Sequence, residues 1–170
     1  MIAITITNEQ SALRIDRRRL AAAVRAALKG EGLSDARISL AVVGDARIHA
    51  LNRQFLAHDW PTDVLSFVLQ QSDGHLEGEI VVSAERAVAE SRRYGLEPDE
   101  ELLLYVVHGA LHLAGHDDAR PPKRRAMRRR EKECLARLGV VGQASRLAPS
   151  KSCPASTPAR MPVKQGGSPR

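Results

Sequence analysis

The order of hydrophobic and polar residues predicts four strands. Ile2, Ile4 and Ile6 alternate with alanine and threonine, a period of two that is typical of a strand with one buried face. Three further apolar runs of strand length occupy residues 37–43, 64–69 and 79–82. The turn sequence Ser72-Asp73-Gly74 separates the last two runs, so we expect them to form a hairpin.

Apolar residues at helical spacing predict five helices between and after these strands. Their expected first residues suit helix starts, and glycines follow several of their ends. The predicted helices begin at Asp16, Asp45, Ser83, Pro98 and Pro121, and end near residues 28, 55, 94, 114 and 138. The order β-α-β-α-β-β-α-α-α predicts an α+β fold, a small mixed four-stranded β-sheet packed with about five helices.

The composition of the chain changes near its C-terminus. From Gly142 onward the sequence is rich in Ser, Pro, Ala and Lys and has no apolar period. We therefore expect one domain over residues 1–140 and a disordered tail over residues 141–170. No apolar run approaches the roughly 20 residues that a membrane span requires, so the sequence predicts no membrane partner.

Cysteine usage bears on the cellular compartment. Cys134 and Cys153 are the only two cysteines, too few for a disulfide framework, which predicts free thiols in a reducing cytoplasm. The N-terminus lacks the basic leader and apolar core of a signal peptide, so we expect cytoplasmic localisation. Aromatic residues make up only 3% of the chain, which argues against an RNA-binding platform built from several exposed rings.

Positive charge is concentrated towards the C-terminus. Residues 1–119 carry 12 Lys and Arg against 18 Asp and Glu, whereas residues 120–137 carry nine against two. Such a basic block is the footprint of a polyanion-binding surface for RNA, and it also fits a merely solvated helix face. The candidate RNA-binding residues lie on the predicted basic helix 122–138: Lys123, Arg124, Arg125, Arg128 and Arg129.

A cluster of histidines near residue 110 predicts a metal site. His108 and His112 are four residues apart, which places both rings on one helix face. Gly115 can end the helix and turn the chain so that Asp118 reaches the same point. The spacing is that of the long-form zinc proteases (zincin-like), with Asp118 where the third histidine usually stands. Three ligands leave a fourth position open, which is the arrangement of a catalytic zinc.

Other interpretations of this segment exist. Two histidines on an apolar helix can be satisfied core residues, but their spacing together with Gly115 and Asp118 favours metal binding. His116 is a weaker ligand candidate, which we expect to line the cleft or face solvent. Gly109 stands where a zinc protease has its glutamate general base, so the motif predicts the metal and argues against peptide hydrolysis. The ligand set also suits iron, nickel or cobalt.

Three segments together resemble the YbeY family of bacterial rRNA maturation endoribonucleases. They are residues 61–67 (PTDVLSF), residues 78–83 (GEIVVS) and residues 108–118 (HGALHLAGHDD). The resemblance covers roughly residues 40–138. It implies a cytoplasmic, single-strand-specific metal-dependent endoribonuclease with one Zn²⁺ per chain. It also implies a role in 16S rRNA 3′-end maturation and ribosome quality control, with ribosomal RNA and the small ribosomal subunit as partners.

The chain departs from the family pattern at two positions. Asp118 replaces the third histidine ligand, and Leu56 stands where the family usually has an arginine thought to engage phosphate. Arg53 or the basic helix are the possible substitutes for that arginine.

The supporting residues leave several alternatives open. Asp63 or Asp117 is expected to orient a ligand histidine or accept a proton, and Asp63 suits a loop cap equally well. Two rival functions remain, a ribosome-associated RNA-binding protein with a structural metal and a metal-dependent hydrolase of another substrate, such as a peptide.

Overall fold

The computed structural model describes residues 1–140, and the predicted tail 141–170 lies outside the described residues. Within this part, the element order is the predicted one. The strands are β1 (Ile2–Asn8), β2 (Asp35–Val43), β3 (Val64–Ser72) and β4 (His75–Ser83). The helices are α1 (Arg17–Leu28), α2 (Asp45–Leu56), α3 (Ala84–Tyr94), α4 (Pro98–Leu113) and α5 (Pro121–Arg137). None of these helices is both long enough and apolar enough to cross a membrane.

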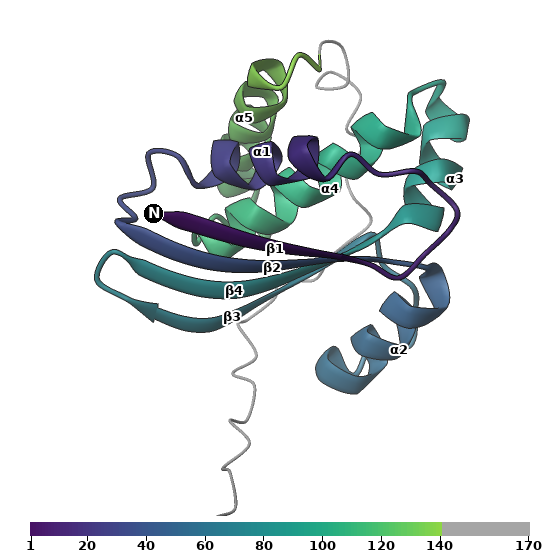
Figure 1. Cartoon of the computed structure of the whole chain (residues 1–170), viewed down its shortest axis with the longest axis horizontal. Helices are drawn as coiled ribbons and strands as arrows, with labels where there is room; N and C mark the ends of the chain where they lie inside the picture. Colours follow the sequence, from purple (N-terminus) through teal and green to yellow (C-terminus); the bar gives the residue numbers. More distant parts are fainter. Residues whose placement is uncertain (141–170) are drawn as a thin grey trace, which may run out of the picture.

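The four strands form one mixed sheet in the order β1-β2-β4-β3 (Figure 1). β1, β2 and β4 run parallel, and β3 pairs antiparallel with β4 through a tight hairpin. Gly74 has a φ of +72° in that turn, a conformation that glycine adopts without steric cost. The predicted α+β fold, a mixed four-stranded sheet with five helices, is therefore confirmed over residues 1–140.

Several helix ends follow from local sequence. Asp16 accepts hydrogen bonds from the backbone N–H groups of Arg18 and Arg19, and so caps α1 as its sequence position predicts. Ser83 caps α3 in the same way. The prediction for Asp45 is wrong by one residue: Gly44 is the N-cap, and Asp45 instead accepts a hydrogen bond from Ser83 Oγ at 2.5 Å.

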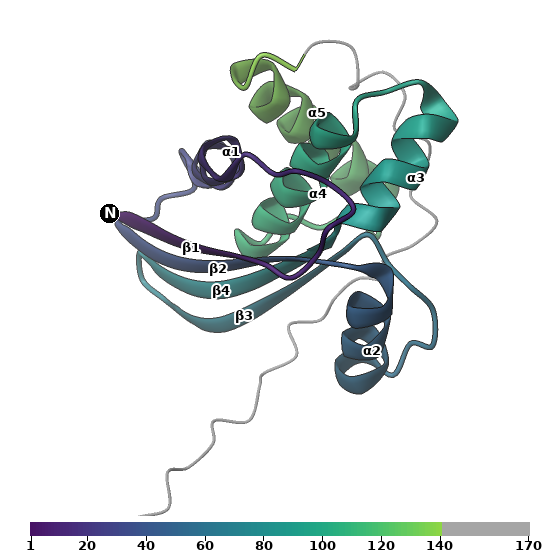
Figure 2. The same cartoon turned by 45° about the vertical axis from the view of Figure 1, so that its right-hand side comes forward.

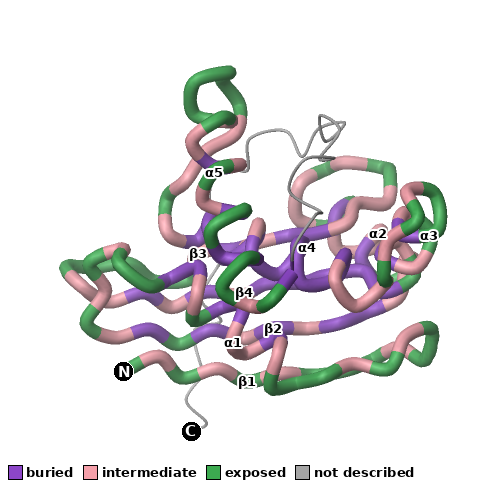
Figure 3. The backbone as a smooth tube through the Cα atoms, turned by 90° about the horizontal axis from the view of Figure 1, so that it is seen from above, coloured by how far each residue is buried: buried purple, intermediate pink, exposed green. Residues whose placement is uncertain are grey.

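The helices cover the two faces of the sheet unequally. α1, α3, α4 and α5 lie on one side, and α2 lies alone on the other (Figures 1 and 2). The larger core is formed between the sheet and the four helices α1, α3, α4 and α5. Helix α4 is almost entirely buried at the centre of this core (Figure 3). A smaller apolar cluster under α2 includes Ile48, Leu65 and Phe67. α4, the predicted carrier of the metal ligands, is thus held from several sides.

Gly109 allows α4 to lie close to the sheet. A Cβ atom at this position would be 2.9 Å from methyl groups of both Val64 and Ile80, closer than packed carbons approach. A side chain fits there only if the helix or these two residues shift, and the glutamate that a zinc protease needs beside its first histidine would require a larger shift than alanine.

We expect Gly109→Ala to destabilise the protein by about 1–2 kcal/mol. Alanine gains up to about 1 kcal/mol of helix propensity over glycine, but overpacking against two stiff β-branched side chains costs about 1–3 kcal/mol. The free energy of unfolding, measured with a chemical denaturant, checks this. A variant more stable than the wild type would show that the helix has room to move away from the sheet.

Candidate metal centre

His108 and His112 lie one turn apart on α4, and their rings meet edge to face. The ring centroids are 4.5 Å apart and the two Nε2 atoms are 3.0 Å apart. Their side chains retain only 16% and 13% exposure, respectively. The i, i+4 spacing therefore brings the two imidazoles together on one partly buried face, as predicted.

Asp118 reaches the same point because the chain reverses after α4. The helix ends at Leu113, and Gly115 adopts a φ of +94°, the left-handed conformation that glycine favours. The carboxylate of Asp118 then places one oxygen 3.9 Å from His108 Nε2 and the other 3.9 Å from His112 Nε2. The three predicted ligands thus converge, and one ligand atom from each lies within 4.8 Å of the others.

The outer nitrogens of both imidazoles have acceptors. His108 Nδ1 lies 2.7 Å from Glu131 Oε1 of α5, and His112 Nδ1 lies 3.0 Å from the backbone oxygen of His116. Because a carboxylate and a carbonyl can only accept, each Nδ1 carries the proton and donates it. When both rings are neutral, their Nε2 atoms are lone-pair acceptors that face each other and Asp118.

This convergence of acceptors fits a metal ion. The two imidazole nitrogens, which are acceptors when both rings are neutral, meet a carboxylate, and a cation would satisfy all three groups at once. Bond lengths of about 2.0–2.2 Å to a tetrahedral zinc place its ligand atoms about 3.3–3.6 Å apart. The observed separations of 3.0 and 3.9 Å lie on either side of that range, so the spacing of the three groups is close to what such an ion requires.

The two histidines differ in their pKa values. Burial lowers the pKa of His108, but the hydrogen bond and the negative charge of Glu131, helped by Asp63 and Asp118, outweigh burial and leave the pKa above its ordinary value. For His112, burial and the neighbouring His108 lower the pKa. The acidic neighbours therefore make His108 the more basic ring of the pair.

His116 does not join the ligand group. Its Nε2 lies 3.2 Å from Glu31 Oε2, and the other oxygen of Glu31 accepts a hydrogen bond from Arg130 at 2.8 Å. His116 thereby links the loop after α4 to residues near the end of α1 and on α5. Since its backbone oxygen is the acceptor for His112, this network helps to hold that ligand in place.

Asp63 and Asp117 were expected to orient a ligand histidine. Within residues 1–140, the structure records no hydrogen bond between either aspartate and a histidine. Asp63 Oδ1 accepts from Thr62 Oγ1 at 3.2 Å and from the backbone N–H of Val64 at 3.1 Å, the alternative role of a loop cap. Asp117 is bonded to the backbone of Ala119 and to Lys123. The orienting carboxylate is Glu131 instead.

Glu131 was not predicted from the sequence. It is only 4% exposed and lies in the buried stripe of α5 with Met127, Cys134 and Leu135. A glutamate among eight basic residues on one helix is read as part of a solvated face. The available signal was its spacing from Met127 and Leu135, which places it on the helix face that packs inward.

The predicted RNA-binding residues begin directly after the metal loop. Lys123, Arg125 and Arg129 are exposed, and Arg128 is half-buried. Arg124 donates to the backbone oxygen of Asp118 at 2.9 Å, so it braces the loop that carries a metal ligand. The basic surface of α5 (Pro121–Arg137) and the metal centre therefore adjoin.

The departure at position 56 is explained by packing. Leu56 lies at the end of α2 against the apolar cluster of Leu65 and Phe67. Arg53, one of the possible substitutes for the missing arginine, has a side chain that is 66% exposed and lies 3.9 Å from Asp59.

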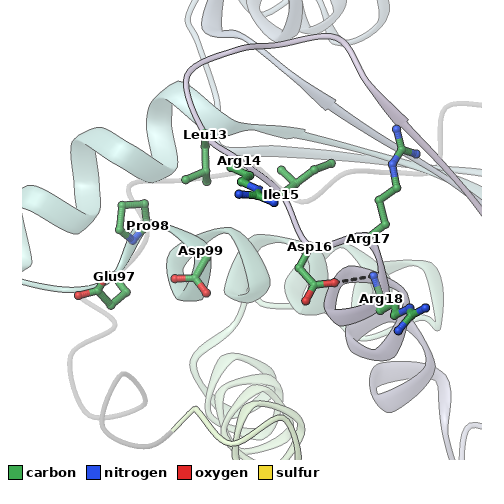
Figure 4. Close-up of a pocket in the computed structure, with 9 residues that line it drawn as sticks. All are labelled: Leu13, Arg14, Ile15, Asp16, Arg17, Arg18, Glu97, Pro98 and Asp99. Carbon is green, nitrogen blue, oxygen red and sulfur yellow. Dashed lines mark hydrogen bonds between the residues drawn. The ribbon is translucent and has the colours of Figure 1, made fainter.

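A groove of about 670 Å³ lies between the loop before α1 and the start of α4 (Figure 4). It contains none of the predicted site residues. Asp16 in its wall is occupied as a helix cap, and Asp99 pairs with Arg19. The groove is at the N-terminal end of α4, whereas the imidazoles lie in the C-terminal half.

Fold and site together define a class of protein: a small α+β domain whose central helix and the loop after it bring together two histidines and a carboxylate that could hold a metal ion. Comparison with known proteins narrows the class. The family model described as Endoribonuclease YbeY matches residues 5–139. This chain belongs to the YbeY family.

Individual relatives agree with this assignment. "Endoribonuclease YbeY" of Rhodopirellula baltica is 46% identical over 126 residues, which cover 73% of this chain and 65% of that protein. The chain thus spans just under two thirds of that relative. "Endoribonuclease YbeY" of Pelotomaculum thermopropionicum is 38% identical over 149 residues, covering 81% of this chain and 98% of that protein. The solution structure of TM1509 from Thermotoga maritima shares the fold, with a TM-score of 0.53, 24% identity and coverage of 89% of this chain and 100% of that chain.

Proposed function

We propose that this protein is a metal-dependent endoribonuclease that cuts single-stranded RNA. The observation that carries the proposal is the convergence of His108, His112 and Asp118, whose ligand atoms lie within 4.8 Å of one another. The name of the relatives, endoribonuclease, supplies the reaction and the class of substrate. The basic surface of α5 beside this centre suits a phosphate backbone.

The chain's own residues would divide the work of the reaction. His108, His112 and Asp118 would hold the metal, which when bound supplies Lewis-acid stabilisation of charge on the phosphate. Glu131 and the backbone oxygen of His116 keep the two rings in the tautomer that presents Nε2. Asp118 contributes a negative charge, so the metal would be a weaker Lewis acid here than with three neutral imidazoles.

Other residues would act on the RNA rather than on the metal. Lys123, Arg125, Arg128 and Arg129 would bind backbone phosphates and so hold the strand against the centre. Asp63 combines its capping contacts with a charge close enough to raise the pKa of His108. We propose it as the candidate proton acceptor of the site.

The finer assignments follow from the family resemblance. We propose zinc as the metal and ribosomal RNA as the substrate. The proposed role is 16S rRNA 3′-end maturation and ribosome quality control on the small ribosomal subunit in the cytoplasm. What supports them is membership of the family and, for the metal, a donor set that zinc accepts.

Incubation of the full chain with small-subunit ribosomal RNA tests the proposal. We expect cleavage by the wild type, loss of cleavage when a chelator is present, and loss in His108→Ala. His49→Ala is the matched control, because His49 lies on α2 and pairs with Asp59 outside the centre. Equal cleavage in all four samples would identify a contaminating nuclease and overturn the proposal.

The same experiment separates the rival function. A structural metal would make the chelator unfold the protein, which circular dichroism detects, while the pattern of RNA products stays unchanged. Leu56 packs against an apolar cluster and stands where the family usually has an arginine thought to engage phosphate. The absence of that arginine favours this rival.

A further inference from the structure

The segment between α2 and β3 presents an aromatic ring to solvent. Of the large hydrophobic side chains in residues 1–140, only Met1, Leu69 and Trp60 are exposed, and Trp60 is 47% exposed. It is also the only tryptophan of the chain. Burying an indole would contribute to stability, so a half-exposed one on an ordered segment suggests a surface that a partner covers.

The backbone of this segment is held in place. Asn52, which is only 2% exposed, donates from Nδ2 to the backbone oxygen of Trp60 at 2.7 Å. Arg86 donates to the backbone oxygen of Pro61 at 3.2 Å. These two bonds hold the backbone of Trp60 and Pro61 and so fix the point from which the indole projects. Binding to it therefore costs little ordering entropy.

A second ring supports the indole. The imidazole of His58 lies parallel to it, with centroids 4.5 Å apart and planes inclined by 15°. His58 therefore covers part of one face of Trp60 and extends the stack, in the way that one base supports the next in a single strand. Acidic and basic side chains both lie near this stack. Asp59 pairs with His49 at 2.9 Å and lies 3.9 Å from Arg53.

The segment leads into β3, which packs against the helix that carries His108 and His112. Trp60 precedes Val64 by four residues, and a side chain at Gly109 would touch Val64, so β3 begins against the residue that follows His108. Four residues of extended chain span at most about 14 Å, the length of about four nucleotides of a stacked strand. Figure 2 shows the segment running beside α2 to the start of β3.

We propose that Trp60, backed by His58, is a stacking site for one unpaired base of the RNA whose cleavage is proposed above. An aromatic ring stacks on any base, but only where the base is not already paired and stacked in a duplex. One such site is compatible with a chain that is poor in aromatic residues. It would give the enzyme a preference for single-stranded RNA beside the cleaved bond. This inference rests on the proposed function.

The single tryptophan makes the test direct. The full chain is titrated, with a chelator present, with a single-stranded RNA of mixed sequence about ten nucleotides long. The fluorescence of Trp60 is excited where tyrosine does not absorb. We expect quenching by the single strand, and little change with the same sequence as a duplex or with inorganic polyphosphate. Equal quenching by polyphosphate would show that the indole senses charge alone and would overturn the proposal.

Variants give a second, independent measurement. We expect Trp60→Leu to bind the labelled single strand about tenfold more weakly in fluorescence anisotropy, while Trp60→Phe keeps most of the affinity. Leu69→Ala is the matched control, because it removes another exposed apolar side chain, 40% exposed on β3. It should bind like the wild type. Thermal unfolding of all three variants checks that each is folded.

The outcomes separate this inference from the proposed function. If the wild type neither binds nor cuts RNA, the proposed function fails and takes the stacking site with it. If the wild type binds and cuts RNA while Trp60→Leu binds the single strand equally well, the endoribonuclease stands and the stacking site is wrong.

Discussion

Replacing His112 with alanine is expected to remove the metal from the purified protein. The wild type should contain about one metal ion per chain, because its three ligand atoms converge on one point. The variant retains one imidazole and one carboxylate, and we expect its affinity to fall at least about 100-fold, more than the loss of a supporting residue causes. Elemental analysis after dialysis measures the metal content, and RNA cleavage should disappear with it.

His75→Ala is the control for this experiment. His75 begins β4 and pairs with Asp35 at 3.0 Å, so its removal deletes an imidazole without touching α4. It should keep the metal. A wild type that is free of metal at neutral pH, or a His112→Ala variant that still holds a full equivalent, would contradict the assignment of the ligands.

Replacing Glu131 with glutamine is expected to weaken metal binding. Glutamine keeps the shape and an acceptor oxygen for His108 Nδ1, but it removes the negative charge that makes this imidazole a stronger donor to a metal. We expect metal affinity to fall about 10- to 100-fold, with the fold retained. Competition with a chelator of known affinity, at a pH well above the histidine range, measures the change without interference from proton binding.

Glu133→Gln is the matched control on the same helix. Glu133 lies two residues further on, its side chain is 45% exposed, and it pairs with Arg130 at 3.1 Å. This variant removes the same charge from the same helix, but outside the metal centre. If both variants bind metal like the wild type, Glu131 is only a packing residue of α5.

The elements of this protein were predictable because local signals agree with the tertiary structure. The alternation of Ile2, Ile4 and Ile6 gives the first strand, and Asp16 and Ser83 cap helices as expected. The two ligand histidines were predictable for the same reason, since four residues on a helix fix a distance. Predicting that Asp118 joins the two histidines required one further inference, the left-handed turn at Gly115.

The supporting residues were not predictable because their contacts join distant parts of the chain. Glu131 reaches back 23 residues to His108, and Glu31 reaches forward 85 residues to His116. The spacing of Glu131 from Met127 and Leu135 places it on the inward face of α5, but no local signal names the histidine that it contacts. Asp63 was considered instead, since it precedes a strand in a motif of the family, and the structure gives it the contacts of a cap.

The residues of the metal centre occur along the chain in an order that matters during translation. Domains generally fold as units, so the metal centre forms only with the domain as a whole. Asp118 and Glu131 both follow α4 (Pro98–Leu113) in the chain and are synthesised after the two histidines. A nascent chain therefore presents two unsupported imidazoles and no complete ligand set. Under the proposed function, the nuclease cannot become active until almost all of its folded domain has been translated, which protects the RNA of the ribosome that is producing it.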